Sequence, residues 1–507
     1  MKKLLLLLLV VSMVSALILA PVVSAEPNKD IDNANKFLKA KFNLESAEQN
    51  FKTMKVKTDE LGFTHVKMQQ IVDGMPVFGN EYIVHFDNNK NVYTTSGNFD
   101  KNAMNYKKGD FIKANEAIEI AKNDVGYTEG TNVNQEDTFT TKLNLYKVAE
   151  EFIPVYVVEV NWLHEDSFGG WSVIVDAVNG NVVNKYDEIR VAKPAPALPV
   201  GTNVTGTGTG VLGDTKTINI LLSNGVYYLL DKTRAAGGVI TYDAAYSTRL
   251  PGTLMSDTDS IWNNSYQYAG VDAHYYVART YDYYMNMFNR NSIDNNGMAL
   301  KSTVHYKNEY VNAFWNGTQM VFGDGDGVMS LALSGGFDIV AHELTHGVDS
   351  YEADLVYQDE PGALCESFSD VLATSAEYYV QPTMFDWQVG EDVWTPAVAG
   401  DALRSLEDPT IYGDPAHMDD YVYTSQDYGG VHTNCGIPNK AAYLIGSNIG
   451  VEKMGAIYYR ALSVYLTSSS NFTQCRTACM QCAVDLYGAG STEYNAVVSA
   501  FNAVGIY

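Results

Sequence analysis

Two histidines four residues apart flank a glutamate in the run His342-Glu343-Leu344-Thr345-His346. Residues at this spacing share one face of an α-helix, so both imidazoles could reach one ion from a rigid support. Catalytic zinc commonly keeps three protein ligands and an open position for water, whose pKa it lowers from 15.7 to about 7. Glu343 is placed to take the proton of that water. The pattern therefore predicts zinc-dependent hydrolysis.

The surroundings of this pentapeptide matter, because such a short pattern can occur by chance. A turn and then apolar residues precede it from 334 to 341, as expected where a helix begins. A second stretch, 362–372, also has apolar residues at helical spacing, with Glu366 and Asp370 four apart on one face. Glu366 suits a third zinc ligand. Asp370 suits an outer carboxylate that fixes the tautomer of a ligand histidine.

Further motifs follow one another between about Gly210 and Tyr507. They are Asn312-Ala313-Phe314-Trp315-Asn316-Gly317, Gly323-Asp324-Gly325-Asp326-Gly327, Gly429-Gly430-Val431-His432 and Asn439-Lys440-Ala441-Ala442-Tyr443. Together with the helix of His342 and His346, their order resembles the thermolysin family of secreted neutral zinc metalloproteases, of the bacillolysin type. The resemblance implies an endopeptidase that is made as an inactive preproenzyme.

The resemblance also implies roles for four residues outside the zinc helix. His432 and Tyr357 match the donors that stabilise the oxygen on which negative charge develops during amide hydrolysis. Asp427 matches the carboxylate that pairs with this histidine. Arg404 matches the arginine that binds a substrate carbonyl, although a buried arginine can equally belong to a structural ion pair.

Substrate binding follows from the same resemblance. Asn312 and Ala313 match residues that align the peptide against an edge strand. The family prefers a bulky hydrophobic residue on the amino side of the new terminus, and five apolar residues match its pocket: Leu333, Ile339, Val389, Val393 and Leu403. Ser330 replaces a phenylalanine of the family, so a wider pocket is expected.

Calcium is the second ion that the resemblance implies, because clustered oxygen ligands suit it. One site, beside the zinc helix, would use Asp338, Glu377, Asp386 and Glu391, and Gln388 replaces a carboxylate there, so the number of ions is left open. A loop site would use Asp257 and Asp259, and another Trp394, Thr395 and Asp401. Ordinary surface acidity is the alternative for each.

The N-terminus and the net charge predict where the protein works. Lysines, a leucine-rich stretch and the small residues before Ala25 are typical of a secretory signal peptide. A net charge of -26 argues against a nucleic-acid or anionic-membrane partner. We expect a secreted, extracellular protein that acts on proteins and peptides, has its own propeptide as inhibitor and chaperone, and is a monomer after maturation.

Composition divides the 507 residues into six regions. Alternating strands with turns at Asp73-Gly74 and at 87–89, then a helix at 114–123 and further strands, indicate an α+β propeptide in two parts. A Pro/Ala linker precedes a sheet-rich stretch and then a helical one, so an α+β, two-lobe zincin is expected with the active-site helix between its lobes. The expected boundaries are 1–25 (signal peptide), 26–109 and 110–190 (propeptide), 191–203 (linker and processing region), 204–340 (N-terminal lobe) and 341–507 (helical C-terminal lobe).

Five cysteines all lie in the expected C-terminal lobe, so at least one stays unpaired. Cys365 stands where the family has an asparagine that holds the second histidine. The resemblance puts it near Cys435, and a disulfide between them is one hypothesis. Cys475, Cys479 and Cys482 have helical spacing, which favours buried small residues over a redox or metal cluster.

Two other functions remain possible on sequence grounds. A gluzincin aminopeptidase shares the two histidines and the distant glutamate, but the chain has no Gly-x-Met-Glu-Asn segment to grip a free amino terminus. A noncatalytic binding module would be expected to lose Glu343, a zinc ligand or His432, and all are present. The endopeptidase is therefore the favoured function.

Overall fold

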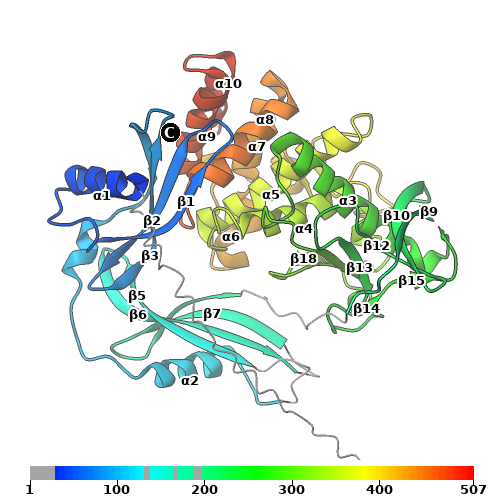
Figure 1. Ribbon diagram of the computed structural model, residues 1–507, viewed down its shortest axis with the longest axis horizontal. Helices are drawn as coiled ribbons and strands as arrows, with labels where there is room; N and C mark the ends of the chain where they lie inside the picture. The colour runs from blue at the N-terminus through cyan, green and yellow to red at the C-terminus, as the bar shows by residue number, and fades with distance from the viewer. Residues whose placement is uncertain (1–28, 131–136, 165–167, 188–196) are drawn as a thin grey trace, which may run out of the picture.

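The computed structural model describes residues 29–130, 137–164, 168–187 and 197–507. The expected signal peptide and residues 191–196 of the expected linker lie outside the described residues. Within the described ranges, no helix is long and apolar enough to cross a membrane. Figure 1 shows a strand-rich N-terminal part in blue and cyan, beside a larger part that runs from green strands to yellow, orange and red helices.

Residues 29–187 are built on one eight-stranded sheet of order β1-β2-β3-β5-β6-β7-β8, with β4 paired to β3. Its two halves meet where β3 runs parallel to β5 at the single pair Val77 and Leu145. The elements are α1 (Lys29–Phe42), β1 (Phe51–Thr58), β2 (Thr64–Val72), β3 (Met75–Phe86), β4 (Val92–Gly97), η1 (Lys101–Asn105), α2 (Ala114–Asp124), β5 (Thr138–Val148), β6 (Glu151–Leu163), β7 (Phe168–Asp176) and β8 (Val182–Asp187).

Strand alternation gives the first half of this sheet two different faces. Val66, Val84 and Phe86 point into an apolar cluster with α1. His65 and His85, each one residue away and paired across β2 and β3, must point to the opposite face. The expected hairpin turn at Asp73-Gly74 is confirmed, with both residues at positive φ. The helix expected at 114–123 is confirmed as α2.

The next stretch forms two sheets, of order β15-β11-β10-β9-β16 and β12-β13-β17-β19-β18, with β14 paired to β13. Strand β18 is therefore an edge strand. The elements are β9 (Thr202–Thr209), β10 (Thr215–Ser223), β11 (Val226–Tyr228), β12 (Leu230–Asp231), β13 (Val239–Asp243), β14 (Thr253–Leu254), β15 (Ser256–Asp257), β16 (Ile261–Trp262), η2 (Ser265–Gln267), α3 (Tyr268–Phe288), β17 (Leu300–Val304), β18 (Ala313–Trp315) and β19 (Met320–Phe322).

Helices dominate the remainder, as the sequence predicts. The elements are η3 (Leu333–Gly335), α4 (Phe337–Asp349), α5 (Asp359–Val380), β20 (Gln388–Val389), β21 (Arg404–Ser405), η4 (Pro409–Tyr412), η5 (Met418–Asp420), α6 (Asp427–Asn434), α7 (Gly436–Ile449), α8 (Val451–Arg460), the π-helical turn η6 (Ala461–Tyr465), α9 (Phe472–Tyr487) and α10 (Thr492–Ala503).

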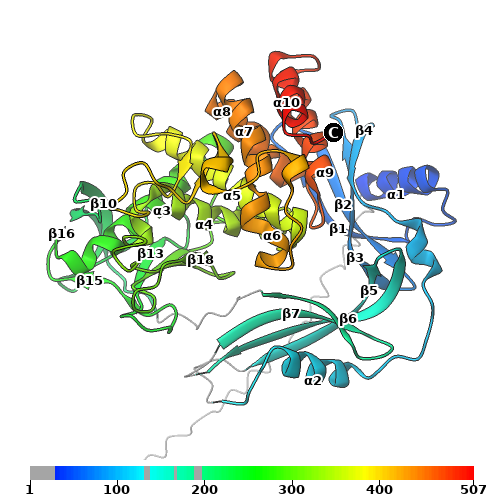
Figure 2. The same ribbon diagram turned by 180° about the vertical axis from the view of Figure 1, so that it is seen from behind.

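Helix α4 lies between the sheet-rich and helical lobes. It packs against α3 and β18 on one side and against α5 on the other (Figure 2). One continuous apolar core joins both lobes through it, from Ile220 and Phe322 to Val340, Phe368 and Phe501. All residues of α4 except His346 are buried, the polar ones included. The expected two-lobe arrangement with a central helix is confirmed.

The three cysteines with helical spacing lie on α9, fully buried in the same core. Of the described residues, none of those that gather into a candidate metal cluster is a cysteine. The structure therefore favours buried small residues over a second metal site.

Phe368, on α5 between Glu366 and Asp370, is fully buried against Tyr458, with ring centroids 5.1 Å apart. Phe368→Ala should lower the free energy of unfolding by about 3–5 kcal/mol, because it leaves a cavity under the site. Guanidinium unfolding of the full-length protein with and without the substitution would measure this loss. Tyr423→Ala is the control, since Tyr423 is 89% exposed and should change stability by less than about 0.5 kcal/mol. Equal losses in both variants would contradict the packing argument.

Candidate metal centre and cleft

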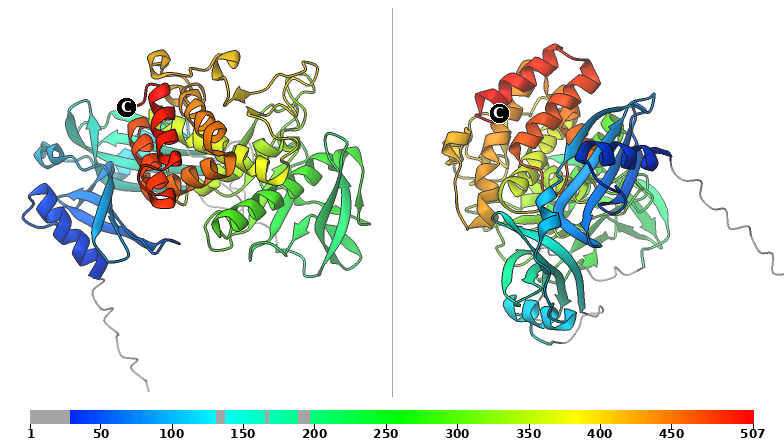
Figure 3. Two further views of the ribbon diagram at one scale, coloured as in Figure 1. Left: turned by 90° about the horizontal axis from the view of Figure 1, so that it is seen from above. Right: turned by 90° about the vertical axis from the view of Figure 1, so that its left-hand side faces the viewer.

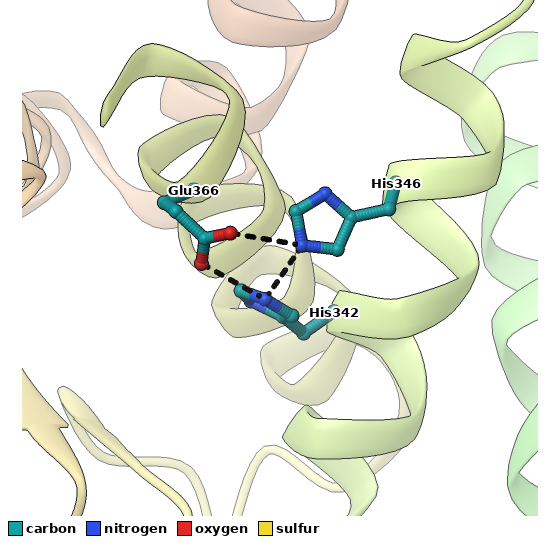
Figure 4. Close-up of side chains that lie close together, drawn as sticks. All are labelled: His342, His346 and Glu366. Carbon is teal, nitrogen blue, oxygen red and sulfur yellow. Dashed lines mark hydrogen bonds and ion pairs between the residues drawn. The ribbon is translucent and has the colours of Figure 1, made fainter. Parts of the chain in front are cut away.

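Helices α4 and α5 bring three candidate metal ligands together (Figure 4). His342 and His346 point from successive turns of α4, and their Nε2 atoms lie 2.9 Å apart. The carboxylate of Glu366, on α5, has one oxygen 3.3 Å from His342 Nε2 and the other 3.4 Å from His346 Nε2. One ligand atom from each residue lies within 4.8 Å of the others.

These residues fit a zinc ion. Two imidazole nitrogens and one carboxylate oxygen are a common donor set of catalytic zinc, with a fourth position left for water. Glu366 Oε2 is buried and accepts no hydrogen bond from any described residue, although His342 is within ion-pair distance. A cation between the three side chains would pair with that oxygen.

Asp370 orients the first histidine, as the sequence predicts. Its Oδ1 accepts a hydrogen bond from His342 Nδ1 at 2.8 Å, which leaves the Nε2 lone pair facing Glu366. Burial raises the pKa of Asp370, but Arg404 and His342 outweigh it and hold that pKa well below its usual value. Asn439 on α7 also donates to Asp370, at 2.8 Å. No local pattern signals this role of Asn439, because it lies on a distant helix.

Two side chains of α5 hold the second histidine. His346 Nδ1 lies 3.3 Å from Cys365 Sγ and 3.2 Å from Ser369 Oγ. Ser369 was not singled out from the sequence, although it is three residues from Glu366 and so shares its face of the helix. Cys365 Sγ also donates toward Asp349 Oδ2 at 3.4 Å.

The hypothesis of a Cys365–Cys435 disulfide is wrong in this structure, because both thiols are free. Cys435 Sγ donates to the backbone oxygen of His432 at 2.9 Å. Cys365 instead faces His346 and Asp349. Cys365 and Cys435 therefore contact different partners and not each other.

Glu343 lines the same cleft as the three candidate ligands and is largely buried. Burial raises its pKa above the usual value, while the neighbouring His342 and His346 act in the opposite direction. A carboxylate with a raised pKa is a better proton acceptor, which suits a general base.

His432 and Tyr357 line the same cleft, and Asp427 contacts His432. His432 Nδ1 lies 2.6 Å from Asp427 Oδ1, and its Nε2 lies 3.1 Å from the hydroxyl of Tyr357, which also donates to Glu366. Burial raises the pKa of Tyr357 well above its usual value, so its hydroxyl keeps its proton. The two expected donors, His432 and Tyr357, and the carboxylate expected to pair with His432 are therefore close together.

A glycine kink in α6 positions His432. Tyr428, Gly429 and Gly430 all have positive φ, which interrupts the helix just before it. A Cβ at Gly429 would lie 2.1 Å from Asp359 Oδ1, so a side chain would not fit there. The glycines thus allow the backbone to pass close to the start of α5.

Arg404 combines the two roles considered from the sequence. Its Nε and Nη2 donate to Asp370 at 2.8 and 2.7 Å, as in a structural ion pair. Its side chain nevertheless lines the cleft, and Nη1 donates to none of the described residues. A substrate carbonyl could therefore accept a hydrogen bond from Nη1 while the ion pair stays intact.

The cleft has a volume of about 770 Å³. Asn312 and Ala313, at the edge strand β18, line it together with most of the expected pocket residues, namely Leu333, Ile339, Val389 and Leu403. Val393 does not line it and is fully buried behind this wall.

The expectation that Ser330 widens the pocket is not supported. Ser330 is fully buried and pairs with Trp394 in an isolated β-bridge. A Cβ at Gly325 would lie 2.4 Å from Ser330 Oγ, so the hydroxyl is turned toward that glycine. Trp394 lines the cleft instead.

Buried carboxylates gather beside α4. Burial, and then repulsion between the groups, raises the pKa of Asp338 to about 6, of Glu377 to about 9 and of Glu391 to about 10. Asp386 contributes to this repulsion, as does Asp392, which the sequence did not single out. Glu377 Oε2, Glu391 Oε2 and Gln388 Oε1 are buried without a hydrogen bond.

The two expected loop sites differ from this cluster. Asp257 accepts hydrogen bonds from Gln267 and from backbone amides of its own turn. Asp259 likewise accepts from Ile261 N at 2.7 Å. Asp401 accepts from Thr395 Oγ1 at 2.7 Å and from Ala402 N. These carboxylates already have partners.

Family models match most of the chain after residue 204 and part of the stretch before it. Residues 205–350 match the family model of the thermolysin metallopeptidase catalytic domain, and residues 353–506 that of its alpha-helical domain. Residues 49–99 match the fungalysin/thermolysin propeptide motif.

Individual relatives match over nearly the whole chain. A bacillolysin of Bacillus cereus is 45% identical over 92% of this chain and 87% of its own length. A thermolysin of Bacillus sp. (strain EA1) is 46% identical over 89% of this chain and 85% of its own length. A solved precursor of protealysin, a metalloproteinase from Serratia proteamaculans, is 37% identical over 53% of this chain and 87% of its own, with a TM-score of 0.49.

The propeptide motif at 49–99 precedes the peptidase domains, so the chain is made as a proenzyme. The chain belongs to the thermolysin metallopeptidase family and is a zinc-dependent endopeptidase.

Proposed function

We propose that His342, His346 and Glu366 hold the zinc ion, and that Glu343, Tyr357 and His432 carry out peptide hydrolysis around it. The supporting observation is that all six side chains line one cleft, while Asp370 and Asp427 orient the histidines from behind. When bound, zinc supplies the Lewis acidity that makes water nucleophilic near neutral pH.

The protein's own side chains move protons and stabilise charge. Glu343 accepts a proton from the attacking water and passes it to the amide nitrogen that leaves. Tyr357 and His432 donate hydrogen bonds to the substrate oxygen as it becomes negative. Arg404, through Nη1, and Asn312 and Ala313, along β18, hold the peptide backbone in line.

The apolar wall of the cleft supports a preference for a bulky hydrophobic residue directly after the scissile bond, where it becomes the new amino terminus. Leu333, Ile339, Val389 and Leu403 would contact this side chain, with Trp394 beside them. Val393 would support the wall from behind.

We further propose that the enzyme is secreted, that residues 1–25 are removed as a signal peptide, and that 26–190 act as inhibitor and chaperone until cleavage within 191–203. The mature part, with lobes at 204–340 and 341–507, would then work as an extracellular monomer. The acidic net charge of -26 agrees with a soluble exported enzyme.

Calcium is proposed at the buried carboxylates beside α4. Asp338, Glu377, Asp386 and Glu391 would ligate it, and Gln388 could offer its free oxygen. A cation there would remove the repulsion that raises these pKa values. The sites at Asp257 and Asp259 and at Trp394, Thr395 and Asp401 rest on the resemblance alone.

Glu343→Gln should leave zinc content at one ion per chain while abolishing peptide hydrolysis, because the amide cannot accept the water's proton. The measurement is cleavage of a quenched peptide with Leu or Phe after the scissile bond, before and after o-phenanthroline and then with zinc restored. Activity of the unaltered enzyme should vanish with the chelator and return with zinc. Glu452→Gln, at an exposed glutamate of α8, is the matched control. A Glu343→Gln enzyme that keeps a tenth of the activity would disprove the assignment.

His432→Phe should lower kcat by about 10²–10³ with little change in KM, because one donor to the developing charge is lost. Glu366 raises the pKa of His432 against burial, with help from Asp427. The protonated donor is therefore lost only as pH rises through a value above about 6.5. The fall of kcat on that alkaline side should disappear in the variant. His417→Gln, at a partly exposed histidine paired with Asp419, should keep the unaltered profile; if it also lost the alkaline limb, the assignment would fail.

Glu377→Gln should abolish the rise in melting temperature that calcium gives to the zinc-loaded enzyme. Calcium at about 100 times its Kd should stabilise the unaltered protein by about 2.7 kcal/mol, because it binds only the folded cluster. Thermal unfolding in calcium-depleted and calcium-supplemented buffer would measure this difference. The exposed-site variant Glu452→Gln should respond like the unaltered protein, and an equal response of Glu377→Gln would exclude calcium from this cluster.

A further inference from the structure

The surface between the propeptide sheet and the catalytic domain contains a buried arginine. Arg460, at the end of α8, is 2% exposed. Its Nη2 lies 2.8 Å from Asp59 Oδ2 in the propeptide and 2.9 Å from Asp485 Oδ2 on α9. The Asp59 side chain is fully buried as well. Because an unpaired buried charge is strongly unfavourable, separating the two parts would require both groups to be solvated again.

Aromatic and charged contacts surround this ion pair, where the blue strands lie beside the orange and red helices (Figure 3). Tyr465, in the π-helical turn η6, donates to Asp485 at 2.5 Å and lies 2.7 Å from the hydroxyl of Tyr93 on β4. Single π-helical turns are rare and often occur at functional sites. The contact with Tyr93 ties this turn to the propeptide.

A histidine pair in the propeptide completes the network. His65 Nε2 lies 3.0 Å from Asp59 Oδ2, and its Nδ1 lies 2.8 Å from His85 Nδ1. His85 Nε2 lies 3.0 Å from Ser96 Oγ, and its ring stacks on Tyr465 at 4.5 Å. At 2.8 Å only one of the two Nδ1 atoms can carry a hydrogen, so the docked pair accepts at most one extra proton.

Burial lowers the pKa of His85 well below its usual value, and the neighbouring His65 and Arg460 lower it further. In contrast, His65 and Arg460 bring the pKa of Asp59 down to about 2 although burial raises it. Asp59 therefore stays ionised in mild acid while His85 stays neutral. His85 can therefore bind a proton only after the residues packed around it have separated.

The face that carries these histidines is covered by the catalytic domain, since α1 packs on the other face. The groups that surround the pair come from five segments: Asp59 after β1, Tyr93 and Ser96 on β4, Arg460 on α8, Tyr465 in η6 and Asp485 on α9. His65 also borders a small cavity with Lys55, Lys57, Lys67 and Glu352. Undocking would expose the His85 imidazole to water, where the usual pKa of a histidine is about 6.5.

We propose that Arg460 anchors the propeptide through Asp59, and that protonation of the His65–His85 pair loosens this docking, so that the propeptide separates more readily in acid. The inference rests on the proposed function only in taking residues 29–187 as propeptide. A base whose pKa is depressed in the docked state favours docking above its free pKa. Docking should therefore weaken as pH falls below about 6.5.

Hydrogen–deuterium exchange of the full-length, zinc-loaded Glu343→Gln protein would test this, because that variant should not cut itself. After correction for intrinsic exchange, protection of residues 461–474 should fall by about fivefold from pH 6.5 to 5.5, as one proton is taken up on opening by a group with a free pKa of about 6.5. His85→Gln, which can still hydrogen-bond but cannot titrate, should show no such fall. Arg460→Met should lose protection even at pH 8, because Asp59 and Asp485 would be buried without their cation.

His164→Gln is the matched control, since His164 is a buried histidine that pairs with Asp137 inside the propeptide. It should keep the full acid response, and α4 should stay protected throughout. Unchanged protection of the parent protein between pH 8 and 5.5 would overturn the proposal, as would an equal acid response in His85→Gln. If His85→Gln does not dock at pH 8, the acid responses of His65→Gln and of the parent protein are compared instead. No peptide is cleaved in this experiment, so its outcome is independent of whether the cleft hydrolyses peptides.

Discussion

The buried carboxylate of Asp370 joins four separate segments of the catalytic domain. From α5 it accepts hydrogen bonds from His342 on α4, Arg404 on β21 and Asn439 on α7. A single ionised carboxylate thus fixes the tautomer of His342, a candidate metal ligand, and the direction of the Arg404 guanidinium that lines the cleft. Removing any partner would leave a buried charge short of compensation, which is the most costly change that a protein interior can suffer. The geometry of the cleft therefore depends on this one interaction.

The surrounding core explains how such a polar centre can be held. Helix α4 is buried on nearly all sides, and α5 packs along it, so the candidate ligands move only if the apolar core moves. The same burial raises the pKa of Glu343 and of the acidic cluster at Glu377. At Glu377, repulsion from neighbouring carboxylates adds to this shift. The metal binding proposed for the two places would therefore be linked to the folding of this lobe.

The contact with the propeptide also combines carboxylates, histidines and an arginine, but these groups share their hydrogen bonds and ion pairs differently. At the candidate metal centre, Arg404 and Asn439 donate hydrogen bonds to Asp370, the carboxylate that also holds His342. At the propeptide surface, Arg460 is shared between Asp59 and Asp485, and two histidines share one hydrogen. A network of this kind is stable when complete and sensitive to one added proton. Such a surface suits a segment that must bind firmly during folding and leave later.

The sequence by itself determined the parts that depend on local periodicity. The spacing of His342 and His346, and of Glu366 and Asp370, follows from helix geometry, and the hairpin turn at Asp73 follows from turn chemistry. The resemblance added His432 and Tyr357, which do lie together at the cleft. Only the tertiary structure decided which partners meet across distant elements. It turned Ser330 away from the cleft, kept Cys365 apart from Cys435 and paired Arg460 with Asp59. The physical reason is that local spacing is set by backbone geometry, whereas long-range contacts depend on how whole elements pack.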